Sequence, residues 1–253
     1  MVHSVTFIPL LFTVISAATF ADWPDPSGST SVPATIVVKA GETYDGNLTR
    51  FISGWGGGDQ SEGQDPVFNL EDGATIKNVV LGAPAADGIH CEGSCVIENC
   101  WWEDVGEDAA TFKGAVGDTY LVSGGGAKEA DDKVFQHNGN GSATIQNFQA
   151  ENIGKLYRSC GNCVYNGDDR HVVIDSVKLT GTTKVIAGIN ENYGDSATLT
   201  NIEIDGTVEV VCETYTGTTD NSAEPVSVSE YKQTEDGDGK YCIYTTSDLT
   251  IES

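Results

Sequence analysis

An apolar residue followed two positions later by Asn or Ser recurs at regular intervals along the middle of the chain. The polar members of this step lie 21, 24, 24, 29 and 25 residues apart. The six steps are Ile76-Lys-Asn78, Ile97-Glu-Asn99, Leu121-Val-Ser123, Ile145-Gln-Asn147, Ile174-Asp-Ser176 and Leu199-Thr-Asn201. Repeats of this size are typical of a β-solenoid, whose coils bury their apolar faces only when they stack. The pattern therefore predicts an all-β fold, a parallel β-helix, with the Asn and Ser side chains turned inward as a hydrogen-bonded ladder.

The segments around these repeats predict a single domain over residues 22–253. No stretch keeps apolar residues at helical spacing for three turns, so long helices are not expected. Residues 54–66 read as a glycine-rich loop. The interval of 29 residues holds an insertion at residues 161–169, which we expect to form a groove wall, because solenoids place insertions on loops of the binding face. The pattern fades after residue 212, and residues 213–253 are expected to cap the stack.

The N-terminal 21 residues have the pattern of a secretory signal peptide. They contain no acid, and an apolar run from Val5 to Ile15 precedes small residues that allow cleavage after Ala18 or Ala21. The run is too short to span a bilayer, and no other segment approaches that length. We therefore expect a signal peptide over residues 1–21 and a secreted, extracellular protein that has no membrane partner.

The seven cysteines of the chain fit an oxidising compartment, where disulfides form and persist. Cysteines 91 and 95 span a turn, as do 160 and 163, while 212 and 242 can tie the tail to the body. The odd number leaves at least one thiol unpaired, and the sequence alone does not fix the connectivity. Zinc binding by these cysteines is a less favoured alternative.

The net charge of −25 excludes nucleic acid as a partner, because phosphates need a basic surface. Six of the 13 Lys and Arg residues lie between residues 113 and 170, which is the one locally basic region. An anionic substrate must therefore be attracted by local rather than net charge.

Three segments in and before this region each begin with an acid and end at a glycine: residues 87–93, 108–114 and 132–139. Equivalent positions of stacked coils lie about 4.8 Å apart, so we expect Asp87, Asp108 and Asp132 to form a column, with Glu107 beside it. Carboxylates this close stay ionised only when a cation neutralises them, and hard oxygen ligands suit Ca²⁺. The alternative is that these acids are turn residues at strand starts.

A basic cluster on neighbouring coils favours a functional site over turn residues. Lys133 follows the acid column directly, Lys155 and Arg158 are expected on the next coil, and Lys113 belongs to the same cluster. On a polymer with a carboxylate on each sugar, such as polygalacturonate, calcium acidifies the C5 hydrogen. A neutral lysine, its pKa depressed by neighbouring cations, can then remove this proton and expel the oxygen at C4. We predict Lys133 as the base and Lys155 and Arg158 as the groups that bind substrate carboxylates.

Other candidates in the same region are better explained by structure. His90 and His137 lie in predicted strands, where His is more often a structural residue than an acid or base. Trp101 and Trp102 can stack on sugar rings, but packing is the favoured interpretation.

Four ordered blocks of this sequence resemble the compact pectate lyases of polysaccharide lyase family three. They lie at residues 78–91, 101–114, 133–139 and 154–163, and include Trp101-Trp-Glu-Asp-Val-Gly-Glu-Asp-Ala-Ala-Thr-Phe-Lys-Gly114 and Gly154-Lys-Leu-Tyr-Arg-Ser-Cys-Gly-Asn-Cys163. The resemblance implies a secreted, right-handed, single-stranded parallel β-helix that cleaves pectate by calcium-dependent β-elimination. It implies the metal ligands Asp87, Glu107 and Asp108, and a substrate-binding and catalytic cluster of Lys113, Lys133, Lys155 and Arg158. Asp132 has no counterpart in the family pattern, and the tail from residue 213 departs from it.

Two other functions remain open at this point. A polygalacturonase-like hydrolase shares the β-helix but works with paired acids and a water molecule. A non-catalytic carbohydrate-binding solenoid would not need Lys133 and Arg158 gathered at one point. For the lyase we expect a monomer and an alkaline pH optimum, because a lysine base must lose its proton.

Overall fold

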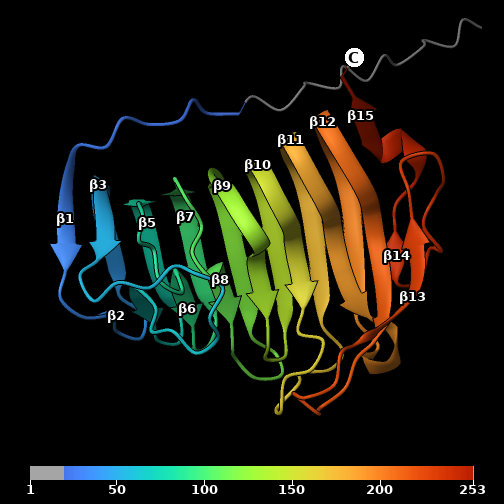
Figure 1. The fold of residues 1–253 in the computed structure, drawn as a ribbon, viewed down its shortest axis with the longest axis horizontal. Helices are drawn as coiled ribbons and strands as arrows, with labels where there is room; N and C mark the ends of the chain where they lie inside the picture. Colours follow the sequence, from blue (N-terminus) through green and yellow to red (C-terminus); the bar gives the residue numbers. More distant parts are fainter. Residues whose placement is uncertain (1–19, 253) are drawn as a thin grey trace, which may run out of the picture.

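The structure, a computed structural model, describes residues 20–252 and contains strands, two short 3-10 helices and no α-helix within that range (Figure 1). The strands are β1 (Gly28–Val32), β2 (Ile36–Val38), β3 (Thr43–Ser53), β4 (Phe68–Leu70), β5 (Ala74–Leu81), β6 (Ile89–Cys91), β7 (Cys95–Trp102), β8 (Asp108–Phe112), β9 (Thr119–His137), β10 (Ser142–Ser159), β11 (His171–Asn190), β12 (Ser196–Thr216), β13 (Val226–Tyr231), β14 (Cys242–Ile243) and β15 (Leu249–Ile251). The 3-10 helices are η1 (Glu191–Tyr193) and η2 (Thr246–Asp248). The predicted signal peptide, except for positions 20 and 21, lies outside the described residues.

Two parallel ladders run along the molecule. One joins β1, β3, β5, β7, β9, β10, β11 and β12 in that order, and the other joins β2, β4, β6, β8 and β9. From β9 onward, single strands of 18 to 21 residues take the place of two short ones. This stacking confirms the predicted parallel β-helix. Among the described residues, no helix has the length and apolar character needed to cross a membrane.

The Asn and Ser of the sequence repeat lie where the ladder pairing is interrupted, and their backbone is left-handed. Values of φ between 50 and 55° occur at Asn78, Asn99, Asn147, Ser176 and Asn201. Asn is favoured there because its short polar side chain tolerates this conformation. These side chains are half-buried or exposed, so the predicted inward ladder is wrong. One link of such a ladder is present, from Asn99 Nδ2 to Asn78 Oδ1 at 2.8 Å.

The third repeat lies one residue later than the sequence pattern predicts. Val122 rather than Leu121 pairs with Ile97 on one side and Ile145 on the other. The left-handed corner is then Gly124, with φ of 71°, and not Ser123. Glycine adopts this conformation without steric cost, so the polar residue of the pattern was not needed at this corner.

The apolar members of the repeat stack inside the coil. Ile76, Ile97, Ile145, Ile174 and Leu199 are fully buried. Burying one such side chain stabilises the fold by about 1.5–3 kcal/mol, which only stacked coils can provide.

The adjacent tryptophans Trp101 and Trp102 both pack inside the protein. Trp102 contacts Phe135 and Phe148 with ring centroids 6.3 and 6.4 Å apart, and Trp101 packs edge-on against Trp23 at 4.8 Å. Their exposed fractions are 1% or less, so packing, the favoured interpretation, is confirmed.

Three disulfides join the cysteine pairs 91–95, 160–163 and 212–242, and Cys100 is buried and free. The third disulfide ties β14 to the last long strand, β12. In the tail, β13 pairs antiparallel with β12, and β14 and β15 pair parallel with it.

Candidate active site

The ladder register decides which charged residues stack. Ile89 pairs with Ala110, so the same offset places Asp87 on Asp108, and Asp108 pairs in turn with Lys133. Lys133 pairs with Lys155 on β10. The column therefore runs Asp87, Asp108, Lys133, Lys155, and the predicted third acid is wrong by one residue. Asp132 lies beside the column because the coil from Asp108 contains 25 residues rather than the expected 24.

Asp87, Glu107 and Asp108 form a compact acid cluster. Each offers an oxygen within 4.8 Å of the others, and their exposed fractions are 5%, 4% and 2%. Burial raises the pKa of Asp87 to about 6 and that of Glu107 to about 7, and it raises the pKa of Asp108 well above its usual value. Asp87 Oδ1 and Asp108 Oδ1 accept no hydrogen bond from any described residue.

These features fit a hard divalent cation. Three buried carboxylates, two of which have an unsatisfied oxygen, are costly unless they are protonated or neutralised by a cation. Oxygen ligands grouped in this way suit Ca²⁺ in particular. The acid cluster therefore matches the ligand set expected from the sequence.

Lys133 lies against the acid cluster. Its Nζ is 3.4 Å from Asp108 Oδ1 and 2.7 Å from Asp132 Oδ2, and the residue is 7% exposed. Burial opposes the charge of this ammonium, but the carboxylates of Asp108 and Asp132 outweigh it and raise the pKa of Lys133. The expectation that neighbouring cations depress this pKa is therefore wrong for the protein without a metal, because its nearest charged neighbours are acids.

Asp132 bridges two lysines instead of joining the acid cluster. Its Oδ1 accepts a hydrogen bond from Lys155 Nζ at 2.8 Å while its Oδ2 pairs with Lys133. Burial alone would raise the pKa of Asp132, but Lys133 and Lys155 together lower it to about 2. Asp132 thus holds the two ammonium groups next to each other.

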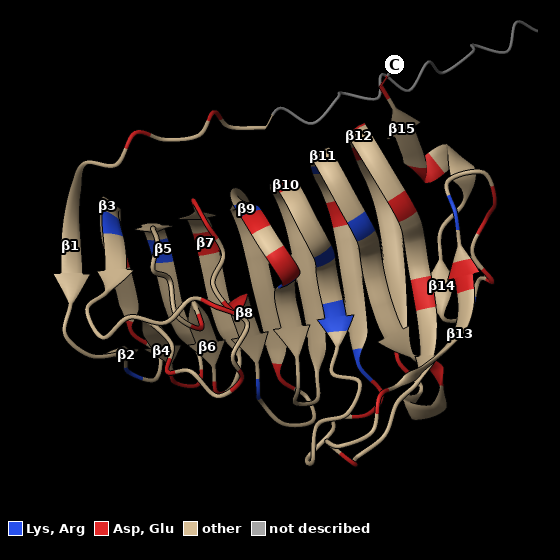
Figure 2. Ribbon diagram, in the orientation of Figure 1, with Lys and Arg blue, Asp and Glu red and all other residues tan. Residues whose placement is uncertain are grey.

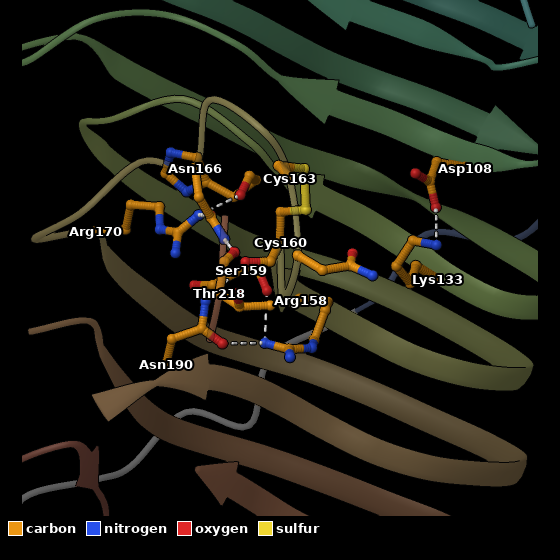
Figure 3. Close-up of a disulfide and its surroundings, with 12 residues drawn as sticks. Asp108, Lys133, Arg158, Ser159, Cys160, Cys163, Asn166, Arg170, Asn190 and Thr218 are labelled. Atoms are coloured by element: carbon orange, nitrogen blue, oxygen red, sulfur yellow. Dashed lines mark hydrogen bonds and ion pairs between the residues drawn. A yellow bond between two sulfur atoms is a disulfide. The ribbon is translucent and has the colours of Figure 1, made fainter. Parts of the chain in front are cut away.

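Arg158 extends the basic part of the site on β10. Its side chain is 5% exposed, and burial lowers the pKa of the guanidinium to about 10. Nη1 donates to Ser159 O at 2.5 Å and to Asn190 Oδ1 at 3.0 Å (Figure 3). Nη2 has no partner among the described residues. The free N–H groups of Nη2 are available to a bound carboxylate.

Lys113 reaches the acid cluster through a histidine. Lys113 Nζ lies 2.7 Å from His90 Nδ1, and His90 Nε2 lies 2.7 Å from Asp87 Oδ2. Burial, with a further effect of Lys113, lowers the pKa of His90 to about 4, so the ring is neutral near pH 7. A neutral ring with the proton on Nε2 donates to Asp87 and accepts from Lys113. Sequence reasoning treated His90 as structural and missed this link.

The second histidine stays outside this chain of contacts. His137 is fully buried, and its Nδ1 lies 2.8 Å from the hydroxyl of Tyr157. This environment fits the structural role expected from the sequence.

Three adjoining hollows of about 500, 590 and 370 Å³ cover this face, and Glu62 and Gln136 line all three. The first contains the acid cluster and Lys113, and the third contains Lys133, Lys155 and Arg158. The second is lined by residues of the insertion at 161–169, as expected of a groove wall.

Glu62 was not singled out from the sequence. Burial and the neighbouring Glu107 raise its pKa. It lies in the glycine-rich loop over residues 54–66, where no repeat pattern marked it.

Basic residues are sparse along the ribbon, whereas acidic residues occur on strands throughout it (Figure 2). Four of the 13 basic residues of the chain, Lys113, Lys133, Lys155 and Arg158, nevertheless line these hollows. These bases share the hollows with acids such as Glu62, Asp132 and Glu224, so the groove brings basic side chains next to a buried acid cluster on a very acidic protein.

Known proteins with similar sequences and structures are pectate lyases. The pectate lyase family model matches residues 20–222. The chain is 44% identical over 226 residues to the probable pectate lyase D of Emericella nidulans, covering 88% of this chain and 82% of the relative. It is 47% identical over 207 residues to the probable pectate lyase E of Aspergillus flavus, covering 80% and 77%.

Solved structures agree with the sequence matches. The catalytic domain of pectate lyase PelI from Erwinia chrysanthemi superimposes with a TM-score of 0.72 at 33% identity, covering 90% of this chain and 98% of that one. Pectate lyase Pel3 from Pectobacterium carotovorum gives a TM-score of 0.75 at 34% identity, covering 87% and 68%. By fold, by sequence and by the extent of both matches, the chain belongs to the pectate lyase family.

Proposed function

We propose that this protein cleaves polygalacturonate by calcium-assisted β-elimination and releases unsaturated oligogalacturonides. The observation that carries the proposal is the contact between a buried acid cluster and a column of amines, in which Asp108 lies 3.4 Å from Lys133. One sugar unit can then contact a cation held by the acid cluster and the amine of Lys133 at the same time. An inverting hydrolase keeps its two acids about 6.5–9.5 Å apart to leave room for a water molecule. In this protein the oxygens of the acid cluster lie within 4.8 Å of one another, so hydrolysis with inversion is less well supported.

Asp87, Glu107 and Asp108 would hold the calcium ion. The raised pKa values of all three and the unsatisfied oxygens of Asp87 and Asp108 support this assignment. When bound, calcium would draw electron density from the substrate carboxylate and make the C5 hydrogen more acidic. His90 fixes Asp87 through the hydrogen bond to its Oδ2, and so helps to orient one ligand of the set.

Lys133 is the proposed base that removes the C5 proton. Its ammonium is stabilised by Asp108 and Asp132, so it must first lose part of that support. A cation bound to Asp108 neutralises one of the two carboxylates that stabilise the Lys133 ammonium. The positive charge of Lys155, next to Lys133, also favours the neutral amine form of Lys133. Base function therefore depends on an occupied metal site, and it is favoured at alkaline pH.

Lys155 and Arg158 would bind the carboxylates of neighbouring sugars, and Lys113 would bind one at the opposite side of the acid cluster. Nη2 of Arg158, which has no partner among residues 20–252, supports its part in this scheme, because a buried donor without a partner is costly unless a ligand satisfies it. The buried guanidinium is rigidly held and presents its N–H groups in a fixed plane.

The product formed from pectate tests this function directly. Wild-type protein with Ca²⁺ should generate unsaturated uronides that absorb in the ultraviolet, and a chelator should stop the reaction. Lys133→Ala should lower kcat by about 1,000-fold, the range expected for loss of a general base. Asp104→Asn, which changes an exposed acid outside the cluster, serves as a control. Reducing ends without ultraviolet absorbance would instead identify a hydrolase, and binding without cleavage would identify a carbohydrate-binding solenoid.

Secretion is part of the proposal. It is supported by the apolar N-terminal segment of residues 1–21 and by three disulfides, which persist outside the cytosol. Expression in a fungal host with and without residues 1–21 tests it, since only the full chain should reach the medium.

A further inference from the structure

Arg158 is a buried cation whose described contacts are all with uncharged groups. Nη1 donates to Ser159 O and Asn190 Oδ1, and the guanidinium carbon lies 3.9 Å from the centroid of the Tyr215 ring. Nη2 has no partner within the described range. A buried cation normally pairs with a carboxylate, so the absence of an acidic partner calls for a structural cause.

The fold leaves space for the Arg158 side chain to reach the last coil. Arg158 pairs with Gly188, and Gly188 pairs with Glu213, so the three residues occupy one column. A Cβ atom at Gly188 would lie 2.8 Å from Arg158 Cδ and 3.3 Å from a ring carbon of Tyr215. Glycine therefore lets the arginine side chain pass over this position toward Glu213, whose Cα is about 10 Å away across two strand spacings.

Glu213 is the acid in this column, yet its carboxylate is held by other groups. One oxygen accepts a hydrogen bond from the hydroxyl of Tyr215, and Oε1 accepts one from Ser227 Oγ at 2.7 Å. Ser227 lies on β13, which pairs antiparallel with β12 beside Tyr215. Both oxygens of this largely buried side chain thus have partners other than arginine.

We propose that Tyr215 and Ser227 are positioning residues that keep Glu213 from pairing with Arg158. Arg158 then keeps Nη2 free for a carboxylate of the polygalacturonate chain. The inference rests on the substrate-binding role proposed for Arg158. It gives the C-terminal tail a functional part, since Ser227 lies beyond residue 222, where the family match ends.

The physical reason is competition between two carboxylates for one guanidinium. A bidentate pair between Arg158 and Glu213 would be intramolecular, and a substrate carboxylate would have to displace it. Binding would weaken while the chemical step on bound substrate changed little. The expected signature is a higher KM with a nearly unchanged kcat.

Removing each hydroxyl separately tests the idea. Tyr215→Phe keeps the aromatic ring under the guanidinium and loses one hydrogen bond to Glu213, and Ser227→Ala loses the other. Each variant should raise the KM for a galacturonate trimer by about tenfold. When each substitution is combined with Lys133→Ala to prevent cleavage, the Kd of the trimer, measured by calorimetry, should rise by a similar factor relative to Lys133→Ala alone. Ser229→Ala, on the same strand but without a described hydrogen bond to Glu213, is the matched control and should match wild type.

A second substitution separates positioning from simple structural damage. Glu213→Gln removes the competing charge, so its addition to Tyr215→Phe or to Ser227→Ala should return KM to within about twofold of wild type. Failure of Glu213→Gln to restore KM in either background would overturn the proposal. If Tyr215→Phe does not fold, as judged by circular dichroism and thermal melting, the Ser227→Ala cycle gives the answer alone.

Arg158→Ala distinguishes this inference from the proposed function. Loss of trimer binding in Arg158→Ala, together with unchanged KM in Tyr215→Phe and Ser227→Ala, would overturn the positioning role only. Unchanged binding in Arg158→Ala would overturn both that role and the part assigned to Arg158 in substrate binding.

Discussion

At the scale of single residues, the site depends on carboxylates placed where they are unfavourable without a counter-ion. Asp87, Glu107 and Asp108 are almost fully buried, and their carboxylates lie close enough to repel one another when ionised. Lys133 offsets part of this charge, but two carboxylate oxygens remain without a hydrogen-bond donor in the described range. Stability and metal binding are therefore linked through the same three side chains.

Asp108→Asn should separate these two effects. With calcium present, activity should fall by about two orders of magnitude, because even groups that only support a metal ligand contribute about 10–100-fold. Without calcium at alkaline pH, the variant should melt at a higher temperature than wild type, because a buried charge is removed. Thermal melts with calcium and with chelator measure both. A variant that is equally active, or less stable under both conditions, would contradict the assignment of Asp108.

Without calcium, thermal stability should fall as the pH rises from about 5 to about 8. The pKa values of Asp87 and Glu107 in the folded protein are raised to about 6 and about 7, so the folded state binds more protons than the unfolded state in this range. Their stabilising contribution is complete below the unfolded pKa values and is lost as pH passes through the folded ones. Calcium should flatten the profile. Calorimetry across this pH range, with and without calcium, provides the comparison.

At the scale of elements, left-handed corners determine how strands stack. Asn, Ser or Gly at each corner lets the chain change direction while the apolar residue two positions before stays inside. The repeat pattern was therefore sufficient to predict the parallel coils. It was not sufficient for the register, because Gly124 replaces Asn at one corner and the coils differ in length.

Asn147 allows a clean test of the corner geometry. It is exposed, has φ of 52°, and forms no side-chain hydrogen bond that the structure describes. Asn147→Ala should lower the free energy of unfolding by about 1 kcal/mol, because an L residue with a Cβ is strained there. Asn147→Gly should be close to neutral, because glycine adopts this conformation freely. Urea denaturation of both variants gives the difference, and equal losses in the two would contradict a conformational cause.

Parts of the site that follow the repeat were predictable, and parts that do not follow it were missed. The sequence predicted that Asp87, Glu107 and Asp108 lie together, and the structure shows this cluster, whereas Asp132 was misplaced by the one-residue difference in coil length. Glu62 lies in the glycine-rich loop, and Tyr215 lies near the start of the tail. Neither segment follows the repeat, so the sequence pattern does not predict which residues they contact. The pKa of Lys133 depends on distances to Asp108 and Asp132 that a sequence does not contain.

At the scale of the whole molecule, the last long strand joins the stack to the C-terminal tail. β12 pairs with β13, β14 and β15, and the disulfide between Cys212 and Cys242 closes a loop of 30 residues. The same strand carries Glu213 and Tyr215 beside Arg158. The end of the solenoid and one end of the proposed substrate groove are therefore built from the same residues.

Replacing Cys212 and Cys242 together with Ala should destabilise the protein by about 3–4 kcal/mol, the range for a loop of this size. Because β13 depends on the same region, the KM for the galacturonate trimer should rise as well. Thermal melting and trimer kinetics, compared with a Cys100→Ser control, test both effects. Loss of stability with no change in KM would show that the tail does not support the groove.

A crystal structure with bound Ca²⁺ and a galacturonate trimer tests the central claim most directly. Anomalous scattering should place the ion on Asp87, Glu107 and Asp108. The carboxylate of one sugar of the trimer should lie next to the ion, and Lys133 Nζ should lie within reach of the C5 hydrogen of that same sugar. An ion bound elsewhere, or a sugar whose C5 is out of reach of Lys133, would contradict the account.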